Sequence, residues 1–295
     1  MRGSSNCVEL DALSTDQIGS RVSYFNDARV SYANYRMSKG DYSVLLGNSV
    51  AYGVGASSDS NCIASQLCRL TENPWYNLAG RAYNQTQEVL SLLLLGAERH
   101  KNIVVFSGIN NLIFSLAFNQ FSGPVMPFWG QNEFNTLNDR KEVITSDKKD
   151  EACSLEANYS KMKLFLDRDL QILSAFAKNS FMDNCCAGRL IYVFQPLLAW
   201  LNKDLHPSEK CAIDSWDRDT KSLFKEAHKP HNILPLKDRY LDDLATLCRK
   251  HGIDFFDMNT AKEFIQSDNL FLDRVHLTDL GQLRAAECIV NYLSL

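Results

Sequence analysis

The sequence has no apolar run long enough to cross a membrane. Its apolar runs at 44–47 and 92–95 are short, whereas a spanning helix needs about 20 apolar residues. The first residues also lack the apolar core of about 7–15 residues found in a signal peptide. We therefore expect a cytoplasmic protein with no membrane insertion, although a leader removed ahead of residue 1 stays an open alternative.

Cysteines are sparse and odd in number, which argues against a disulfide scaffold. The chain holds nine, no two of them in a CxxC motif, and the neighbours Cys185 and Cys186 cannot easily pair with each other. Four others fall in apolar helical patterns, where a thiol behaves as a small buried hydrophobic group: Cys62, Cys68, Cys248 and Cys288. This usage indicates a reducing compartment.

Basic charge is not in excess. The chain has 31 Lys and Arg against 35 Asp and Glu, a formal net charge of −4, so no positive field attracts nucleic acid or anionic lipid. Short mixed runs such as 148–151 are typical of solvated loops. We expect no nucleic-acid partner, and these patterns leave the oligomeric state undetermined.

Cofactor motifs are also missing. The chain has no P-loop and no GxGxxG after a predicted strand. Five histidines lie in polar, loop-like contexts, and the pair at 228 and 231 flanks a proline without carboxylate or cysteine partners. These histidines are His100, His206, His228, His231 and His251. We therefore expect neither a metal ion nor an organic cofactor.

Short β-rich apolar runs alternate with helical patterns from residue 40 onward. We predict strands at 43–47, 75–78, 102–106, 189–194 and 253–256, and helices at 60–70, 85–99, 237–250 and 278–293. In the helix at 85–99, Val89, Leu92, Leu93 and Gly96 recur at helical spacing. The strands are apolar on both faces, as in a parallel sheet covered by helices. The pattern therefore predicts an α/β fold in three layers.

Two regions fall outside this alternation. We expect residues 1–40 to be an N-terminal extension packed on the core, and residues 41–295 to be a single domain with an insertion at about 112–155. A segment of that length inside a domain is usually functional or disordered. An ordered lid or substrate wall and a helical insertion packed on the core are both compatible with its aromatics, which include Phe114, Phe118, Phe121, Phe128 and Trp129.

Polar residues follow the predicted strands where a parallel α/β sheet binds its ligands, beyond the carboxyl ends. Ser49 follows the first strand, a turn at 77–84 the second, Asn110 the third, and Asp273 with His276 the fifth. Acyl transfer needs such a set. An imidazole activates a serine hydroxyl, a carboxylate orients the imidazole, and N–H donors stabilise the oxyanion.

With these four blocks in order, the chain resembles the SGNH hydrolases, a flavodoxin-like family of esterases, lipases and carbohydrate acetylesterases. GNS at 47–49 stands where the family has GDS, GINN at 108–111 where it has GxND, and DRVH at 273–276 where it has DxxH. The blocks run through most of the chain. The resemblance implies a central parallel sheet of about five strands in the order 2-1-3-4-5.

The same resemblance implies the catalytic roles. Ser49 is the nucleophile, and His276 is the base that Asp273 orients. The oxyanion donors are the Ser49 backbone N–H, the Asn110 side chain and a backbone N–H of the turn after the second strand. For that last donor, Ala82 stands at the family's glycine position and Gly80 is the second choice.

The chain departs from the family pattern at two further positions. Asn48 replaces an aspartate that mainly shapes the turn, and Asn111 replaces an aspartate whose loss we expect to remove a structural hydrogen bond. Both amides are also candidate substrate-binding groups. Taken singly, each site residue has a structural alternative, such as a helix cap for Ser49 or Asn110. The ordered set favours catalysis.

Together these residues predict a serine ester hydrolase, with an O-acetyl group on a carbohydrate as the first candidate substrate. The first alternative is an O-acyltransferase that moves an acetyl group to or from a sugar of a surface polysaccharide. A non-catalytic binding module that retains the fold is the second. The segment with Phe194, Gln195, Pro196, Lys203 and Glu209 is similar to one in bacterial family members found near surface-polysaccharide genes.

Overall fold

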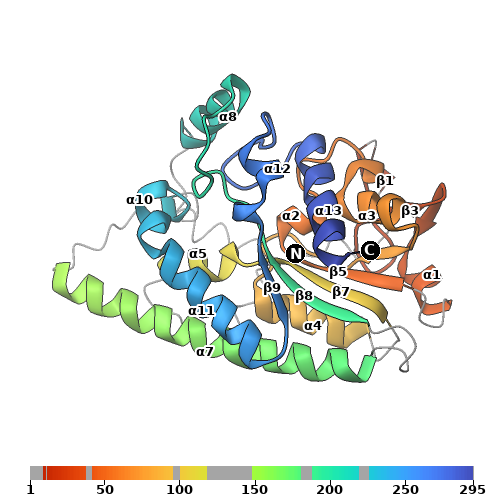
Figure 1. The fold of residues 1–295 in the computed structure, drawn as a ribbon, viewed down its shortest axis with the longest axis horizontal. Coiled ribbons are helices and arrows are strands. Elements are labelled where there is room, and N and C mark those ends of the chain that lie inside the picture. Colours follow the sequence, from red (N-terminus) through yellow and green to blue (C-terminus); the bar gives the residue numbers. More distant parts are fainter. Residues whose placement is uncertain are drawn as a thin grey trace.

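Five parallel strands form the centre of the molecule. The computed structural model describes residues 9–10, 12–37, 42–95, 100–117, 148–180, 188–218 and 226–294. Its main sheet has the order β6-β5-β7-β8-β9 (Figure 1), which confirms the predicted order 2-1-3-4-5. The strands are β5 (Tyr42–Gly47), β6 (Trp75–Asn77), β7 (His100–Ser107), β8 (Arg189–Phe194) and β9 (Asp254–Asp257).

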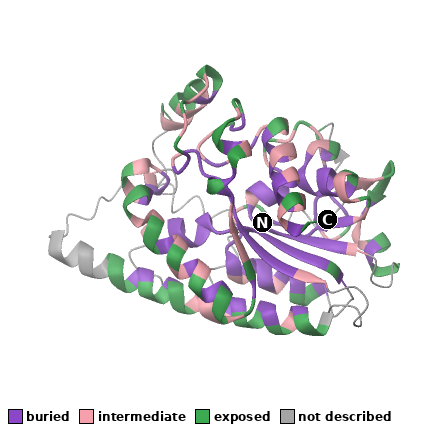
Figure 2. Ribbon diagram, viewed as in Figure 1, coloured by how far each residue is buried: buried purple, intermediate pink, exposed green. Residues whose placement is uncertain are grey.

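Helices cover both faces of this sheet, so the predicted α/β fold in three layers is also confirmed. On one face α3 (Ile63–Thr71) packs against α13 (Asp279–Leu293), and on the other α7 (Lys148–Ser180) packs against α4 (Gln85–Leu95), α5 (Ile109–Ala117) and α11 (Lys237–Lys250). The inner strands are buried on both sides, and their central positions carry consecutive apolar residues (Figure 2).

Smaller elements complete the description. Two hairpins precede the sheet, β1 (Glu9–Leu10) with β2 (Leu13–Ser14) and β3 (Ser23–Phe25) with β4 (Ala28–Val30). The remaining helices are α1 (Tyr32–Met37), α2 (Ser49–Tyr52), α8 (Pro207–Arg218), α10 (Pro230–Ile233) and α12 (Lys262–Ile265). Short 3-10 turns lie at Asp59–Asn61, Leu234–Leu236 and Met258–Thr260.

The segment before β5 is attached to the edge of the sheet at β6. Ser23 Oγ donates to the Trp75 carbonyl (2.6 Å), and the Tyr76 hydroxyl donates to Asp16 (2.9 Å).

The same segment also contacts His100, because the Tyr35 hydroxyl lies 2.7 Å from His100 Nε2. The expectation that His100 lies in a polar loop is wrong: it is the first residue of β7 and fully buried, and burial lowers its pKa to about 4.

The predicted insertion at 112–155 is described only at its ends. Residues 112–117 belong to α5 and residues 148–155 to α7. The stretch between them, with Phe118, Phe121, Phe128 and Trp129, lies outside the described residues, as does the pair Cys185 and Cys186. Phe114 is buried. Whether the insertion forms a lid therefore stays a prediction, as do the domain boundaries.

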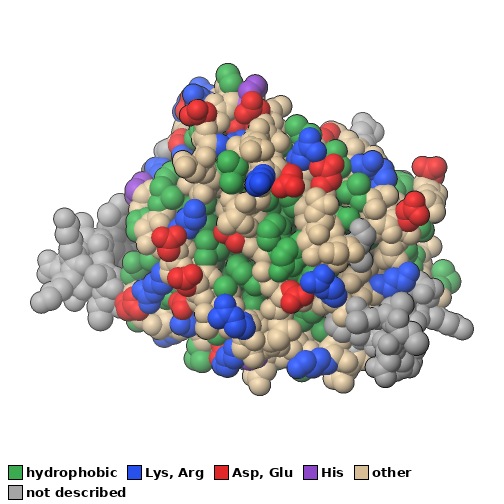
Figure 3. All heavy atoms as spheres, in the orientation of Figure 1, with side chains coloured by type: hydrophobic (Ala, Val, Ile, Leu, Met, Phe, Trp, Pro, Cys, Tyr) green, Lys and Arg blue, Asp and Glu red, His purple; other side chains and the backbone are tan. Residues whose placement is uncertain are grey.

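Ion pairs join α7 to α11 along their exposed sides. Arg239 binds Glu156 (2.6 Å), Lys163 binds Asp243 (2.6 Å) and Lys250 binds Asp167 (2.7 Å). Elsewhere on the surface, acidic and basic side chains are interspersed (Figure 3). Within the described residues, no helix combines the length and apolar character needed to cross a membrane.

The cysteines that were predicted to be buried are buried and unpaired. Cys62, Cys68 and Cys248 have no exposed surface, and Cys288 has 3%. Burial raises the pKa of the Cys68 and Cys288 thiols to about 12. These thiols therefore stay protonated and act as apolar packing groups.

Candidate active site

The turn after β5 presents Ser49 at the start of a helix. Gly47 has φ +150°, and a Cβ there would lie 2.2 Å from the Phe106 carbonyl oxygen, so no other residue fits. Asn48 is the N-cap of α2, because its Oδ1 accepts a hydrogen bond from the Val50 N–H (3.0 Å). Ser49 is then the first helical residue, half-buried, with its N–H at the helix N-terminus.

Ser49, His276 and Asp273 form one chain of hydrogen bonds. His276 Nε2 lies 3.0 Å from Ser49 Oγ, and His276 Nδ1 lies 2.6 Å from Asp273 Oδ2. The other oxygen of Asp273 accepts from the backbone N–H groups of Val275 and His276, both at 2.8 Å. The carboxylate on Nδ1 favours the tautomer whose Nε2 is free to accept the serine proton.

The hydrogen-bond partners of Asp273 favour the ionised form of its carboxyl group. Burial acts to raise the pKa of this carboxyl, but the His276 ring and the two backbone donors outweigh burial, so the pKa lies below its ordinary value. Asp273 is therefore ionised at neutral pH and can stabilise a positive charge on the His276 ring.

Contacts between the segment after α2 and the start of α13 bring the serine to the histidine. Asp279 accepts hydrogen bonds from Ser57 N–H (2.8 Å) and Asn61 Nδ2 (3.0 Å). One layer deeper, Gln282 accepts from the Ile63 N–H (3.1 Å). The last helix is thereby fixed against the segment that follows Ser49 and α2.

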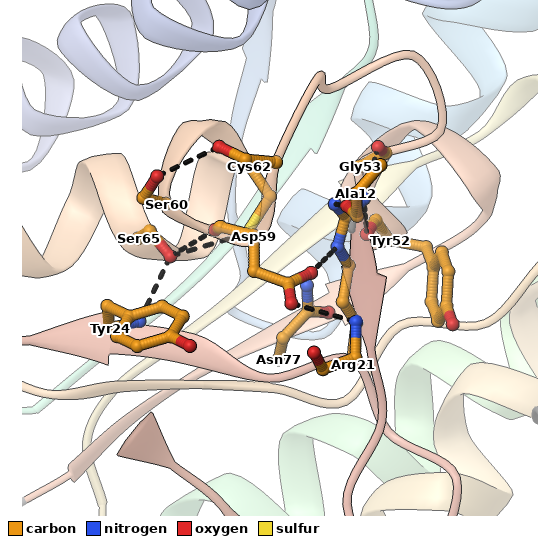
Figure 4. Close-up of polar contacts among 12 residues, drawn as sticks. Ala12, Arg21, Tyr24, Tyr52, Gly53, Asp59, Ser60, Cys62, Ser65 and Asn77 are labelled. Carbon is orange, nitrogen blue, oxygen red and sulfur yellow. Dashed lines mark hydrogen bonds and ion pairs between the residues drawn. The ribbon is translucent and has the colours of Figure 1, made fainter. Parts of the chain in front are cut away.

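A buried arginine holds the far end of α2 (Figure 4). Arg21 donates to the carbonyl oxygen of Gly53 (2.5 Å) and to that of Ala12 (2.9 Å), and its Nε donates to Asp59 (2.8 Å). The Arg21 side chain is 1% exposed and that of Asp59 8%. The sequence reading missed this pair, since no motif or spacing connects residues 21 and 59.

The turn after β6 distinguishes the two candidate backbone donors. The Gly80 N–H already donates to the Gly47 carbonyl (3.0 Å). Ala82 lies in the left-handed region, with φ +58°, and its N–H has no hydrogen bond within the described residues. Asn110 lies at the same turn, because its Nδ2 donates to the Tyr83 carbonyl (2.8 Å). The geometry therefore favours Ala82 over Gly80 as the donor.

Asn48 and Asn111 are held by internal hydrogen bonds. Asn48 Nδ2 donates to Gln195 Oε1 at the end of β8, and Asn111 Oδ1 accepts from the Gln85 N–H (3.1 Å). They are 1% and 8% exposed. Asn111 thus makes a structural hydrogen bond through its Oδ1, and the expected loss of the bond that an aspartate would make stays a prediction. The substrate-binding role of both amides stays a prediction.

Helix α8 lies beside the histidine. The ring centroid of Trp216 is 6.4 Å from that of His276 and 6.5 Å from that of His228, which is buried rather than in an open loop. Asp217 pairs with Arg274 through both carboxylate oxygens (3.1 and 2.6 Å). A hollow of about 800 Å³ lies along α8, lined by Pro207, Lys210, Cys211, Asp214, Asp217 and Arg218.

A second buried ion pair supports the loop that carries Asp273. Lys203 Nζ lies 3.0 Å from Glu209 Oε1, with side chains 3% and 0% exposed. The same carboxylate accepts from the N–H of Leu270 (2.9 Å) and of His206 (3.1 Å). Lys203 and Glu209 therefore act as structural residues here. Among the described residues, no cluster of His, Cys, Asp and Glu is arranged to hold a metal ion.

Comparisons with known proteins gave matches only among solved structures. No family model matches the chain, and no curated protein matches its sequence. Similar structures include an extracellular lipase from Streptomyces rimosus (15% identity, 86% of this chain and 99% of that chain, TM-score 0.47). They also include a phospholipase A1 from Streptomyces albidoflavus (13%, 86% and 99%, 0.48) and a carbohydrate acetylesterase from Sinorhizobium meliloti (10%, 86% and 98%, 0.46).

Proposed function

We propose that this protein is a serine ester hydrolase with Ser49 as its nucleophile. The observation that carries the proposal is the hydrogen-bond chain from Ser49 Oγ through His276 to Asp273, at 3.0 and 2.6 Å. These distances are within the range in which a base can take a proton from its partner. Ser49 comes from the first part of the sequence, and Asp273 and His276 come from the last. Hydrogen bonds to the backbone fix the turn before Ser49 and the carboxylate of Asp273.

The reaction follows from the positions of these groups. His276 takes the proton of Ser49 as Oγ attacks the ester carbonyl, and the imidazolium returns that proton to the departing alcohol. Negative charge on the carbonyl oxygen is stabilised by the N–H groups of Ser49 and Ala82 and by Asn110. Water, activated by His276, then releases the acid from the acyl-serine.

For the substrate we propose an O-acetyl group on a carbohydrate. Trp216 supports this class, because its indole ring lies beside the base (6.4 Å) and indole offers a flat apolar face with a polar N–H edge. A sugar hydroxyl that replaces water in the second step turns the same site into an O-acyltransferase. A non-catalytic module is disfavoured by the alignment of the base with the serine.

The test uses a serine-directed fluorophosphonate together with acetylated sugars. We expect the probe to label Ser49 and acetate to be released. Ser49→Ala and His276→Ala should each lower kcat by about 10⁴-fold or more, with no further loss in the double variant, because residues that act as one unit are not additive. Labelling without acetate release, but with acetyl transfer to an added sugar, would identify the transferase. An unlabelled, folded protein would refute serine catalysis.

A further inference from the structure

Three hydrogen bonds join the start of α4 to the turn between β7 and α5. Asn110 donates to the Tyr83 carbonyl, Asn111 accepts from the Gln85 N–H, and the Ser107 hydroxyl donates to Glu88 Oε1. The first two belong to the polar residues that follow the strands. The third reaches into the core, because Ser107 and Glu88 have no exposed surface.

Glu88 is an acid with little to support a charge. Its second oxygen, Oε2, has no hydrogen-bond partner within the described residues. The titratable groups that face it are Asp169 on α7, Tyr192 on β8 and Tyr240 on α11. Asp169 is in turn bound by a cation, Arg168 (2.5 Å). No charge partner of Glu88 is therefore found in the described part of the chain.

The turn that follows Ser107 is fixed on its other sides. The Ser107 carbonyl accepts from the Gln195 N–H (3.1 Å), and the Gly108 carbonyl accepts from the Tyr240 hydroxyl (2.6 Å). Gly108 has φ +126°, and a Cβ there would come within 2.4 Å of the Phe194 ring. Ser107 Oγ is thus the side-chain anchor of a tightly packed turn that ends at Asn110.

We propose that Glu88 is a positioning residue for the oxyanion hole, because its carboxyl group holds Ser107 at the start of the turn that presents Asn110. The proposal rests on the proposed function, in which Asn110 stabilises the oxyanion. Glu88 does not touch the reacting atoms. It acts through Ser107 and the rigid turn, and it ties that turn to the helix that follows Ala82.

The protonation state of Glu88 then sets the charge beside this turn. Burial raises the pKa of Glu88, the hydrogen bond from the Ser107 hydroxyl partly opposes this, the charge of Asp169 adds to it, and together they place the pKa at about 8. At neutral pH the carboxyl is therefore neutral and the cluster carries no buried negative charge. Above about pH 8 a buried carboxylate forms close to the turn that must stabilise a second negative charge, so the oxyanion becomes less stable.

The experiment measures kcat, KM and the rate of phosphonate labelling from pH 7 to pH 9.5. In the wild type we expect a fall in kcat and in labelling above about pH 8. Glu88→Gln keeps an acceptor for Ser107 but cannot ionise, so it should retain kcat at pH 7 and lose the alkaline fall. Glu88→Ala and Ser107→Ala should lower kcat about 10- to 100-fold with little change in KM, since small misplacements of catalytic groups are costly.

Two controls separate positioning from general stability. Asp169→Asn removes a like charge, lowers the pKa of Glu88 and should move the alkaline fall to lower pH. Asp16→Asn changes a buried carboxyl that binds Tyr76 on the edge strand β6, which β5 separates from β7, and should leave the pH profile unchanged. An alkaline fall that persists in folded Glu88→Gln, or wild-type kcat in folded Ser107→Ala, would overturn the proposal. Failure of the proposed function looks different, because the wild type itself is then unlabelled.

Discussion

At the scale of single residues, the backbone at Ala82 carries strain that a glycine would not. A residue with a Cβ costs about 1–2 kcal/mol in the left-handed region, and Ala82 has φ +58°. Alanine at this position therefore has a conformational cost that glycine, with no Cβ, would avoid. Because the proposed donor at this position is a backbone N–H, we expect the side chain to affect stability more than chemistry.

We therefore expect Ala82→Gly to raise the free energy of unfolding by about 1 kcal/mol and to leave the rate of Ser49 labelling unchanged. Urea unfolding and fluorophosphonate labelling measure the two effects. Ala82→Pro is not a clean test of the donor, because proline cannot adopt φ +58°. A less stable Ala82→Gly variant would show that the left-handed conformation is not strained here.

The side-chain amide of Asn110 has two N–H groups, and one of them already donates a hydrogen bond. Its Nδ2 donates to the Tyr83 carbonyl at 2.8 Å, which leaves the second hydrogen for an oxyanion. Asn110→Ala should lower kcat by about 100- to 1000-fold with a small change in KM. Asn110→Asp should be at least as damaging, because a carboxylate repels the oxyanion. Steady-state kinetics on an acetylated sugar checks both, and a change confined to KM would contradict the role.

At the scale of elements, α2 depends on its surroundings for its position. A helix of four residues cannot stabilise itself, because helix nucleation is unfavourable. Asn48 caps one end, and the Arg21–Asp59 pair binds the carbonyl of Gly53 at the other. The helix that begins at Ser49 is thus held by a residue that precedes the first strand of the sheet.

Removing one member of this buried pair should be costly. We expect Arg21→Met to lower the free energy of unfolding by about 3–5 kcal/mol, because it leaves Asp59 charged and unpaired, and Arg21→Met with Asp59→Leu to recover part of that loss. Urea unfolding of the single and double variants gives both values. A single variant as stable as the wild type would mean that Asp59 finds another partner.

The strands of the main sheet and several of the helices packed on it could be predicted from the sequence. Each predicted strand overlaps an observed one, since a run of buried β-branched and apolar residues is a strong local pattern. No helix was predicted in the place of α7. Its apolar residues are mixed with residues that form ion pairs, so they make no clear apolar stripe along one face. The hairpins β1–β2 and β3–β4 were missed because strands of two or three residues leave no pattern.

The candidate site likewise contains residues that could be predicted from the sequence and residues that could not. Ser49, Asn110, Asp273 and His276 could be placed because each follows a strand of the sheet. Trp216 and Arg21 could not, since only the tertiary structure brings them near the site. Glu88 did have a sequence pattern: it lies four residues before Leu92 on a helix whose buried face includes Leu92 and Leu95. A carboxyl on such a face indicates a buried polar contact.

At the scale of the whole molecule, two carboxyls give stability opposite dependences on pH. The pKa of Asp273 is lowered in the folded state, so its contribution is lost as pH falls through that pKa. The pKa of Glu88 is raised from about 4.5 to about 8. Between these values the unfolded chain is ionised at this position while the folded chain keeps its proton, so stability falls as pH rises.

We therefore expect Glu88→Gln to be as stable as the wild type near pH 4 and increasingly more stable from about pH 4.5 to about pH 8. Above that range the difference should stay constant, because both states of the wild type are then ionised. Urea unfolding midpoints of the two proteins across pH 4–9 give the comparison. A difference that does not depend on pH would mean that Glu88 has the same pKa in the folded and the unfolded protein.

The contact between Ser49 and His276 joins residues that are 227 positions apart in the chain. Any cleavage between them leaves Ser49 on one fragment and His276 on the other, so under the proposed function neither piece would be active alone. Under the proposed mechanism, turnover then reports that both pieces have reassociated through the sheet and through the bonds from Asp279 to Ser57 and Asn61. The protein is in this sense a natural subject for fragment complementation, with ester hydrolysis as the readout of assembly.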